Sequence, residues 1–178
     1  AVVLEDLQRR IGAFSDLYEL LDRSSETEVV DLSDYIPLVV ESLKKSFRTL
    51  AEKVRIELDV EKVQVEPKTA VSLGIILNEL LTNSFKHAYT DAEDGESRAG
   101  DDAPEEGNID VSIRNEERGL VLRTADDGPG LPPDFQLSGG HGIGMSLIEV
   151  LLGQIGGEIS VLSDYGDGAG FIVEVPVQ

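Results

Sequence analysis

Four polar side chains interrupt an otherwise apolar helical pattern between residues 77 and 88. Glu79 and Asn83 are one helical turn apart, and Lys86 and His87 follow one turn later, so all four are predicted on one side of a helix. Burying an acid, an amide, an ammonium group and an imidazole is costly unless these groups bind something. Their combination suits a nucleotide-bound metal ion, so we expect such a site here.

A second candidate site lies between residues 124 and 132, where a predicted strand ends in a carboxylate followed by spaced glycines. The strand end can direct Asp126 into a pocket, and Gly128 and Gly130 allow positive φ angles, so the loop can pivot over a ligand. Asp-Gly and Gly-Pro pairs are also common in ordinary surface turns. Taken alone, the motif is therefore compatible with either interpretation.

A third candidate site is the glycine-rich segment 139–144, which leads directly into an amphipathic helix. The free amides at a helix start, reinforced by the helix dipole, form a site for anions. The segment lacks the strand-associated fingerprint of a dinucleotide fold, and the chain lacks the Gly-Lys-Ser/Thr ending of a P-loop. It therefore indicates a phosphate site of some other type.

The elements that must position these residues alternate between helices and short strands. The helices are predicted from about Leu4 to Leu21, from a cap at Ser33 to about Arg48, from Pro67 to about His87, and from Gly144 to about Gln154. The strands are predicted at 54–60, 109–113, 120–123, 159–162 and 171–175, with the second and third forming a hairpin. This order favours an α+β sandwich.

The first predicted helix carries apolar residues at alternating spacings of three and four, from Leu4 to Leu21. This is the seam of a helix packed in a bundle. The helix either covers its own domain or forms half of an intersubunit bundle, and the pattern alone favours neither.

Composition limits the possible classes of protein. The chain has 178 residues, 40% of them hydrophobic, and no cysteine, so one domain without disulfides or thiolate metal sites is expected. A net charge of -20 argues against binding to nucleic acid or to an anionic membrane surface. No apolar run is long enough to span a membrane, so we expect a soluble domain. A cytoplasmic location is compatible with the absence of cysteine, and it leaves open whether the full-length protein is cytosolic or attached to a membrane. Much of the acid lies in a predicted solvated loop at 90–108.

Together, in this order, the three motifs resemble the ATP-binding domain of the superfamily of gyrase, Hsp90, histidine kinase and MutL. The chain is most similar to sensor histidine kinases whose motif reads Leu-Asn-Glu-Leu-x-Thr-Asn-x-x-Lys-His-Ala. The resemblance implies a Bergerat-type two-layer α/β sandwich, with a mixed, mostly antiparallel sheet covered on one face by helices. It also implies two parts: residues 1–24, the last helix of a dimerisation and phosphoacceptor region, and residues 30–178, the catalytic domain.

The resemblance assigns roles to the first motif. Asn83 corresponds to the ligand of the Mg²⁺ that bridges the ATP phosphates, and Lys86 and His87 correspond to phosphate-binding residues. Glu79 corresponds to the residue that polarises or deprotonates the attacking group, and it is a possible further magnesium ligand. Glu79 and Lys86 are thus the candidate catalytic residues.

The resemblance also assigns the residues around the base and the lid. Asp126 corresponds to the acceptor of a hydrogen bond from the adenine amino group. Gly128 and Gly130 correspond to the hinge of the ATP lid, and Gly142 and Gly144 to the glycines beside the phosphates.

Two positions of the nucleotide site need separate comment. The usual Gly-x-Gly-Thr-x-Phe motif has Ala169 in place of threonine, so the hydroxyl that supports the adenine-binding carboxylate is missing from that position. His141 falls in the lid region, where a solvated residue is a better interpretation than a catalytic one.

The resemblance implies a histidine kinase, a transferase of two-component signalling and phosphorelay, that uses ATP and Mg²⁺. Its phosphoacceptor histidine is expected upstream of this chain, its partners are a second copy bound through the first helix and a response regulator, and the segment itself is not expected to insert into a membrane. The alternatives are a serine/threonine kinase of the anti-sigma-factor type and a degenerate nucleotide-binding interaction module.

Overall fold

The computed structural model describes residues 29–47, 52–89, 107–133, 135–137, 142–162 and 168–176. The elements, in chain order, are β1 (Val30–Asp31), α2 (Leu32–Ser46), β2 (Val54–Val60), β3 (Gln64–Val65), α4 (Pro67–Ala88), β4 (Gly107–Glu116), β5 (Gly119–Asp126), α5 (Gly142–Ile155), β6 (Glu158–Val161) and β7 (Gly170–Val175). The helix predicted for residues 1–24 lies outside the described residues, as does most of the predicted acidic loop.

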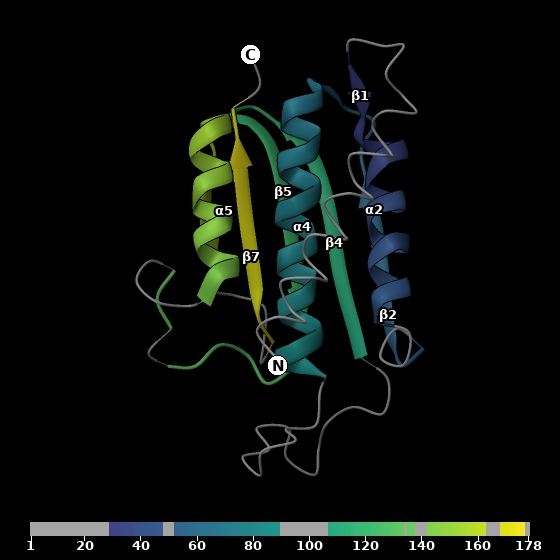
Figure 1. Cartoon of the computed structure of the whole chain (residues 1–178), viewed down its shortest axis with the longest axis vertical. Coiled ribbons are helices and arrows are strands. Elements are labelled where there is room, and N and C mark those ends of the chain that lie inside the picture. Colours follow the sequence, from purple (N-terminus) through teal and green to yellow (C-terminus); the bar gives the residue numbers. More distant parts are fainter. Residues whose placement is uncertain are drawn as a thin grey trace.

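Within the described residues, five strands form one sheet in the order β2-β4-β5-β7-β6. β2 and β4 are parallel, and the other neighbouring strands are antiparallel. The helices α2, α4 and α5 lie side by side on one face of this sheet (Figure 1). The predicted two-layer fold with a mixed, mostly antiparallel sheet is therefore confirmed.

The β4 strand shows why the sequence pattern predicted this sheet. Ile109, Val111 and Ile113 are buried, while Asp110 and Ser112 between them remain partly exposed. Side chains on a strand alternate between the two faces, so the apolar set packs toward the helices. β4 begins at Gly107, inside the range 90–108 predicted for the acidic loop, and pairs with β5 through the predicted hairpin.

The α4 helix is the centre of the molecule. It starts at Pro67, where the missing N–H costs no helical hydrogen bond, as predicted. All its residues from Ser72 to Thr82 are buried. Phe85, in the last turns of the helix, is completely buried and stacks on Phe47, with ring centroids 5.0 Å apart. The end of α4 that carries the polar residues is thus held firmly against the sheet and α2.

The start of α2 differs from the prediction that Ser33 caps it. Asp31 is the N-cap, and its carboxylate accepts hydrogen bonds from the backbone N–H and the hydroxyl of Ser33, at 3.0 and 2.7 Å. The bond from the Ser33 hydroxyl, followed by the other Ser33 contact and Lys62, outweighs burial and lowers the pKa of Asp31. Starting the helix earlier places Leu32 in the helix, where it is completely buried.

Across the residues that the structure describes, each helix is too short or too polar to cross a lipid bilayer.

Candidate functional site

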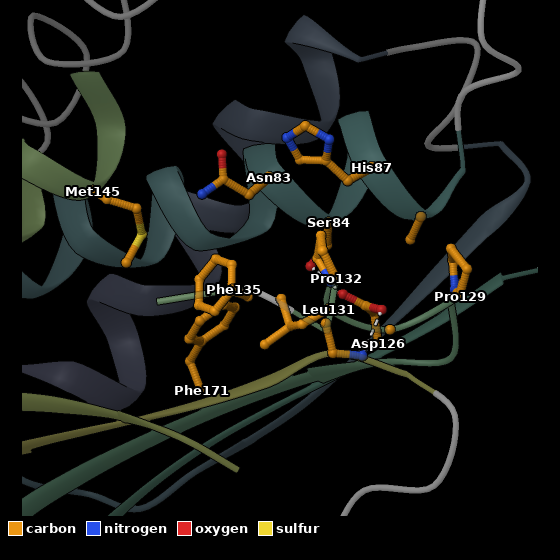
Figure 2. Close-up of a pocket in the computed structure, with 13 residues that line it drawn as sticks. Asn83, Ser84, His87, Asp126, Pro129, Leu131, Pro132, Phe135, Met145 and Phe171 are labelled. Carbon is orange, nitrogen blue, oxygen red and sulfur yellow. Dashed lines mark hydrogen bonds between the residues drawn. The ribbon is translucent and has the colours of Figure 1, made fainter. Parts of the chain in front are cut away.

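A cavity of about 320 Å³ lies between the last turns of α4 and the ends of β5 and β7 (Figure 2). It is bounded by α4, the connection that follows β5, the start of α5 and the segment that enters β7. The residues that line it are Asn83, Ser84, His87, Ala88, Asp126, Pro129, Gly130, Leu131, Pro132, Phe135, Met145, Ala169 and Phe171. The cavity thus joins parts of the first two sequence motifs with Met145, which directly follows the third.

Asp126 is the last residue of β5, and its carboxylate lies in the wall of the cavity although only 3% of the residue is exposed. Its Oδ1 accepts hydrogen bonds from the backbone N–H of Gly128 at 3.1 Å and of Ala169 at 3.2 Å. Its own backbone N–H donates to the carbonyl of Ala169 at 2.9 Å. The carboxylate is therefore fixed in orientation and suited to accept a hydrogen bond from a ligand.

A third donor to this carboxylate comes from the helix on the opposite side. The hydroxyl of Ser84 on α4 donates to Oδ2 of Asp126 at 2.7 Å. In Figure 2, Ser84 projects toward Asp126, whereas Asn83 and His87 project together from the other side of the helix. The last turns of α4 thus present two separate groups of polar residues.

Asn83 and His87 are one turn apart on α4, and both line the cavity. Asn83 is partly buried, while His87 is exposed. An amide oxygen and an imidazole at the rim of a cavity can meet polar or charged parts of a ligand whose ring lies deeper.

The opposite part of the cavity is apolar. Leu131, Phe135, Met145 and Phe171 contribute side chains from the connection after β5, from α5 and from β7. The rings of Phe135 and Phe171 meet edge to face, with centroids 6.0 Å apart and an interplanar angle of 63°. An apolar wall beside one buried acceptor is the arrangement expected for a planar heterocycle that carries an amino group.

Two glycines explain how the backbone after β5 comes so close to its neighbours. A β carbon at Gly128 would lie 2.4 Å from the β carbon of Ala88, so only glycine allows this loop to touch the end of α4. Gly130 lines the cavity and has a φ of 78°, a conformation that glycine adopts readily. Both fit the predicted hinge positions, and whether the segment moves remains a prediction.

Other predicted site residues do not line the cavity. Glu79 is completely buried on α4, and Lys86 is partly buried on the same helix. Gly142 begins α5, and Gly144 is buried in its first turn. The predicted stripe on α4 therefore runs from a buried acid to an exposed imidazole. His141 lies outside the described residues.

Sequence reasoning missed Ser84 and most of the apolar wall. Ser84 directly follows Asn83 in the first motif. The signal that could have identified it was the carboxylate of Asp126, predicted at the end of a strand that faces α4. Phe171 stood in a quoted motif, but only as the residue after a glycine. Leu131 and Phe135 come from a connection with no periodicity, which gives no signal of burial.

A second hydrogen-bonded cluster lies beside the cavity, where α4 ends and β4 begins. The Tyr89 hydroxyl contacts the carbonyl of Asn108 at 2.8 Å and Oδ1 of Asp127 at 2.5 Å. The N–H of Asn108 donates to both carboxylate oxygens of Asp127, at 2.9 and 3.0 Å. Burial, followed by the Asp127 carboxylate, raises the pKa of Tyr89. We call Tyr89, Asn108 and Asp127 the tyrosine clamp.

Within the described residues, no group of three or more histidine, aspartate or glutamate side chains could hold a metal ion. The amide oxygen of Asn83 is a ligand of the hard type that Mg²⁺ accepts, and Mg²⁺ is commonly held by few protein ligands together with substrate phosphates. The residues present therefore fit a metal ion that arrives with a phosphate ligand.

Comparison with family descriptions covers almost the whole chain. Residues 68–178 match the family described as histidine kinase-, DNA gyrase B-, and HSP90-like ATPase. Residues 1–47 match a second family, described as histidine kinase.

Curated proteins with similar sequences carry related names. Blue-light-activated histidine kinase 2 of Erythrobacter litoralis (strain HTCC2594) is 26% identical over 97% of this chain, which corresponds to 46% of that protein. The alginate biosynthesis sensor protein KinB of Pseudomonas aeruginosa is 23% identical over 97% of this chain and 29% of that protein. The chain thus spans less than half the length of these relatives.

Solved structures share the fold. The histidine kinase domain of a blue-light activated histidine kinase from Erythrobacter litoralis EL346 aligns over 96% of this chain and 74% of that one, with a TM-score of 0.73 and 21% identity. The nucleotide-free catalytic domain of histidine kinase ThkA aligns over 83% and 94%, with a TM-score of 0.64 and 18% identity.

Proposed function

Because this chain belongs to the histidine kinase-, DNA gyrase B-, and HSP90-like ATPase family, we propose that its cavity binds the adenine ring of ATP for transfer of the γ-phosphate to a histidine. Its relatives identify the ATP-binding catalytic domain of a sensor histidine kinase. The observation that carries the proposal is the buried, hydrogen-bonded carboxylate of Asp126 in an otherwise largely apolar cavity.

In this proposal the adenine ring lies against the apolar wall, and its amino group donates to Asp126. A carboxylate accepts hydrogen bonds and offers none, so it favours an amino group over a carbonyl oxygen at that position of the base. The cavity is large enough to take a purine ring, at about 320 Å³.

The phosphates would extend past the rim of the cavity. We assign Asn83 to Mg²⁺, and Lys86 and His87 to the phosphates, from α4. Gly142 and Gly144, at the start of α5, would also bind the phosphates, because backbone amides at the start of a helix attract anions. When bound, the metal ion supplies charge neutralisation of the phosphates. Asn83 orients the bound nucleotide through its amide oxygen.

Glu79 would act on the attacking histidine as a polarising group or base. It is completely buried one turn before Asn83. Such a role needs the carboxylate near the phosphoryl group rather than near the base, and Glu79 lies on the α4 residues that precede the adenine part of the cavity.

The acceptor histidine is assigned to a segment upstream of this chain. The family match to residues 1–47, described as histidine kinase, supports a dimerisation and phosphoacceptor region at the N-terminal end. In this proposal that region comprises residues 1–24, and the catalytic domain begins at about residue 30. We propose a homodimer formed through the first helix, a response regulator as the final phosphate acceptor, and a cytoplasmic location.

Titration calorimetry of the 178-residue chain with ATP and Mg²⁺ tests the proposal directly. We expect a single site, and Asn83→Ala is expected to lower the affinity for Mg-ATP by about ten- to a hundredfold, because one hydrogen-bonding or metal-binding group is lost from a charged ligand. Asn115→Ala is the matched control, since Asn115 is an exposed asparagine in β4, outside the cavity. Absence of binding by the unchanged chain at millimolar ATP would refute the function.

A further inference from the structure

We propose that the Ser84 hydroxyl is a positioning group for base recognition, which holds Asp126 so that one acceptor position remains for the amino group of the nucleotide base. This inference rests on the proposed function, because it deepens the description of the same site. It assigns to α4 a part in recognising the base, in addition to the phosphate and metal contacts assigned to it above.

The hydrogen bonds of Asp126 carry the argument. A carboxylate offers about four acceptor positions, two on each oxygen. Among the described residues, the N–H groups of Gly128 and Ala169 occupy Oδ1, and the Ser84 hydroxyl occupies one position of Oδ2. One acceptor position therefore remains on Oδ2, and Asp126 is a residue that lines the cavity. Ser84 thus determines which acceptor the ligand meets.

The direction of the Ser84 bond adds to the selectivity. A serine hydroxyl has one proton, and an ionised carboxylate can only accept, so the proton of Ser84 is committed to Asp126. Ser84 and Asp126 therefore both present oxygen lone pairs to the cavity. A base with an amino group at this point satisfies them, whereas a base with a carbonyl oxygen there meets repulsion.

The position of Ala169 explains why α4 supplies this hydroxyl. Ala169 lies on the other side of the carboxylate and lines the same cavity. Its carbonyl accepts a hydrogen bond from the Asp126 N–H, and its own N–H donates to Oδ1 of Asp126. A hydroxyl on residue 169 would stand beside the carboxylate, but alanine has none. Ser84 provides a hydroxyl donor to the same carboxylate from the facing helix.

Two nucleotides separate base recognition from general effects on the site. ATP has the amino group, and purine riboside triphosphate is the same nucleotide without it. By calorimetry with the 178-residue chain and Mg²⁺, Ser84→Ala is expected to weaken ATP about tenfold, the effect of one hydrogen bond to a charged group. Its affinity for purine riboside triphosphate should be unchanged. Ser84→Thr keeps the hydroxyl and should retain ATP affinity.

Adding Ala169→Thr to Ser84→Ala restores a hydroxyl at the opposite position and should recover most of the lost ATP affinity. Thermal unfolding of each variant checks that the fold is intact, and alanine suits a helix at least as well as serine. The proposal is overturned if Ser84→Ala binds ATP as the unchanged chain does, or if it weakens both nucleotides equally. If the unchanged chain binds no ATP, the proposed function fails as well, so the two failures are distinguishable.

Discussion

At the scale of single residues, Asp126 is held by donors from three separate segments of the chain. Gly128 follows it in the chain, Ala169 precedes β7, and Ser84 comes from α4. Binding a ligand to a group already held in this way costs little conformational entropy, which favours affinity. Changes that disturb the contacts of Asp126 should therefore affect nucleotide binding even when they do not touch the nucleotide.

Gly168 is one such residue. A β carbon there would lie 1.7 Å from the backbone carbonyl oxygen of Asp126, and backbone atoms cannot rotate away. We expect Gly168→Ala to lower the free energy of unfolding by about 1–3 kcal/mol through forced backbone shifts, and to weaken ATP binding. Urea denaturation and calorimetry measure the two effects.

Gly153→Ala is the matched control for that change. Gly153 lies in α5, and an added β carbon meets nothing within 4 Å. Alanine favours the helix over glycine by about 0.5–1 kcal/mol, so this variant should be slightly more stable and bind ATP normally. The prediction is contradicted if Gly168→Ala has the same free energy of unfolding and the same ATP affinity as Gly153→Ala. The backbone around Gly168 would then accommodate a β carbon without loss of stability.

Glu79 offers a test of chemistry that is separate from binding. Glu79→Gln replaces the carboxyl group of a completely buried side chain by an amide of nearly the same shape, so the fold should tolerate it. We expect autophosphorylation of a longer protein that contains the upstream segment to fall by about two to four orders of magnitude, with ATP affinity nearly unchanged. A normal rate of phosphotransfer, measured with labelled ATP, would remove Glu79 from the mechanism.

At the scale of elements, α4 connects the core to the site. Phe85 is completely buried against Phe47, and its neighbour Ser84 faces Asp126. Burial of the apolar residues fixes the rotation of the helix, and that rotation determines where the polar residues point. The tyrosine clamp then ties the end of α4 to β4 and to Asp127, next to the base-binding carboxylate.

The clamp predicts a dependence of stability on alkaline pH. The pKa of Tyr89 is raised in the folded state, so the unfolded chain loses its tyrosine proton first. The contribution of the protonated Tyr89 to the free energy of unfolding is therefore fully present below the ordinary tyrosine pKa of about 10. It is lost as the pH rises above that value. Tyr89→Phe should lower the free energy of unfolding by about 0.5–1.5 kcal/mol at pH 8. The free energy of unfolding of this variant should also decline less steeply above pH 10. Urea denaturation of both proteins across this range measures it, and equal slopes would contradict the assignment.

The elements were predictable from sequence to different degrees. The pattern of β4 and the proline at the start of α4 identified both correctly, because burial there follows simple periods. The start of α2 was predicted wrongly, since both Asp31 and Ser33 can cap a helix and burial of Leu32 decides between them. The roles of Ser84 and of Phe135 in the apolar wall depend on contacts between distant segments, and no local sequence pattern contains such contacts.

At the scale of the whole molecule, charge is the dominant feature. The net charge of -20 opposes both compaction and the approach of a polyphosphate. Raising the salt concentration shortens the screening length from about 30 Å at 0.01 M to about 10 Å at 0.1 M. We expect the midpoint of thermal unfolding to rise over this range, and the association rate of ATP at fixed free Mg²⁺ to increase. Calorimetric scans measure the midpoint of unfolding, and stopped-flow binding measures the association rate. If neither depends on salt, bound cations near the site, and not the net charge, determine both quantities.

The tyrosine clamp also bears on how this protein can change over time. The Tyr89 hydroxyl and the Asn108 carbonyl, on either side of residues 90–106, meet at 2.8 Å, and the ring of Tyr89 occupies the space that a side chain at Gly107 would need. Because Tyr89 and Asn108 hold these two ends together, an insertion between them leaves both ends in place, and each doubling of the length of a connection adds only about 0.6 kcal/mol of closure entropy. Residues 90–106 are thus a natural place for evolutionary drift and a practical place to graft a fluorescent reporter or an affinity tag.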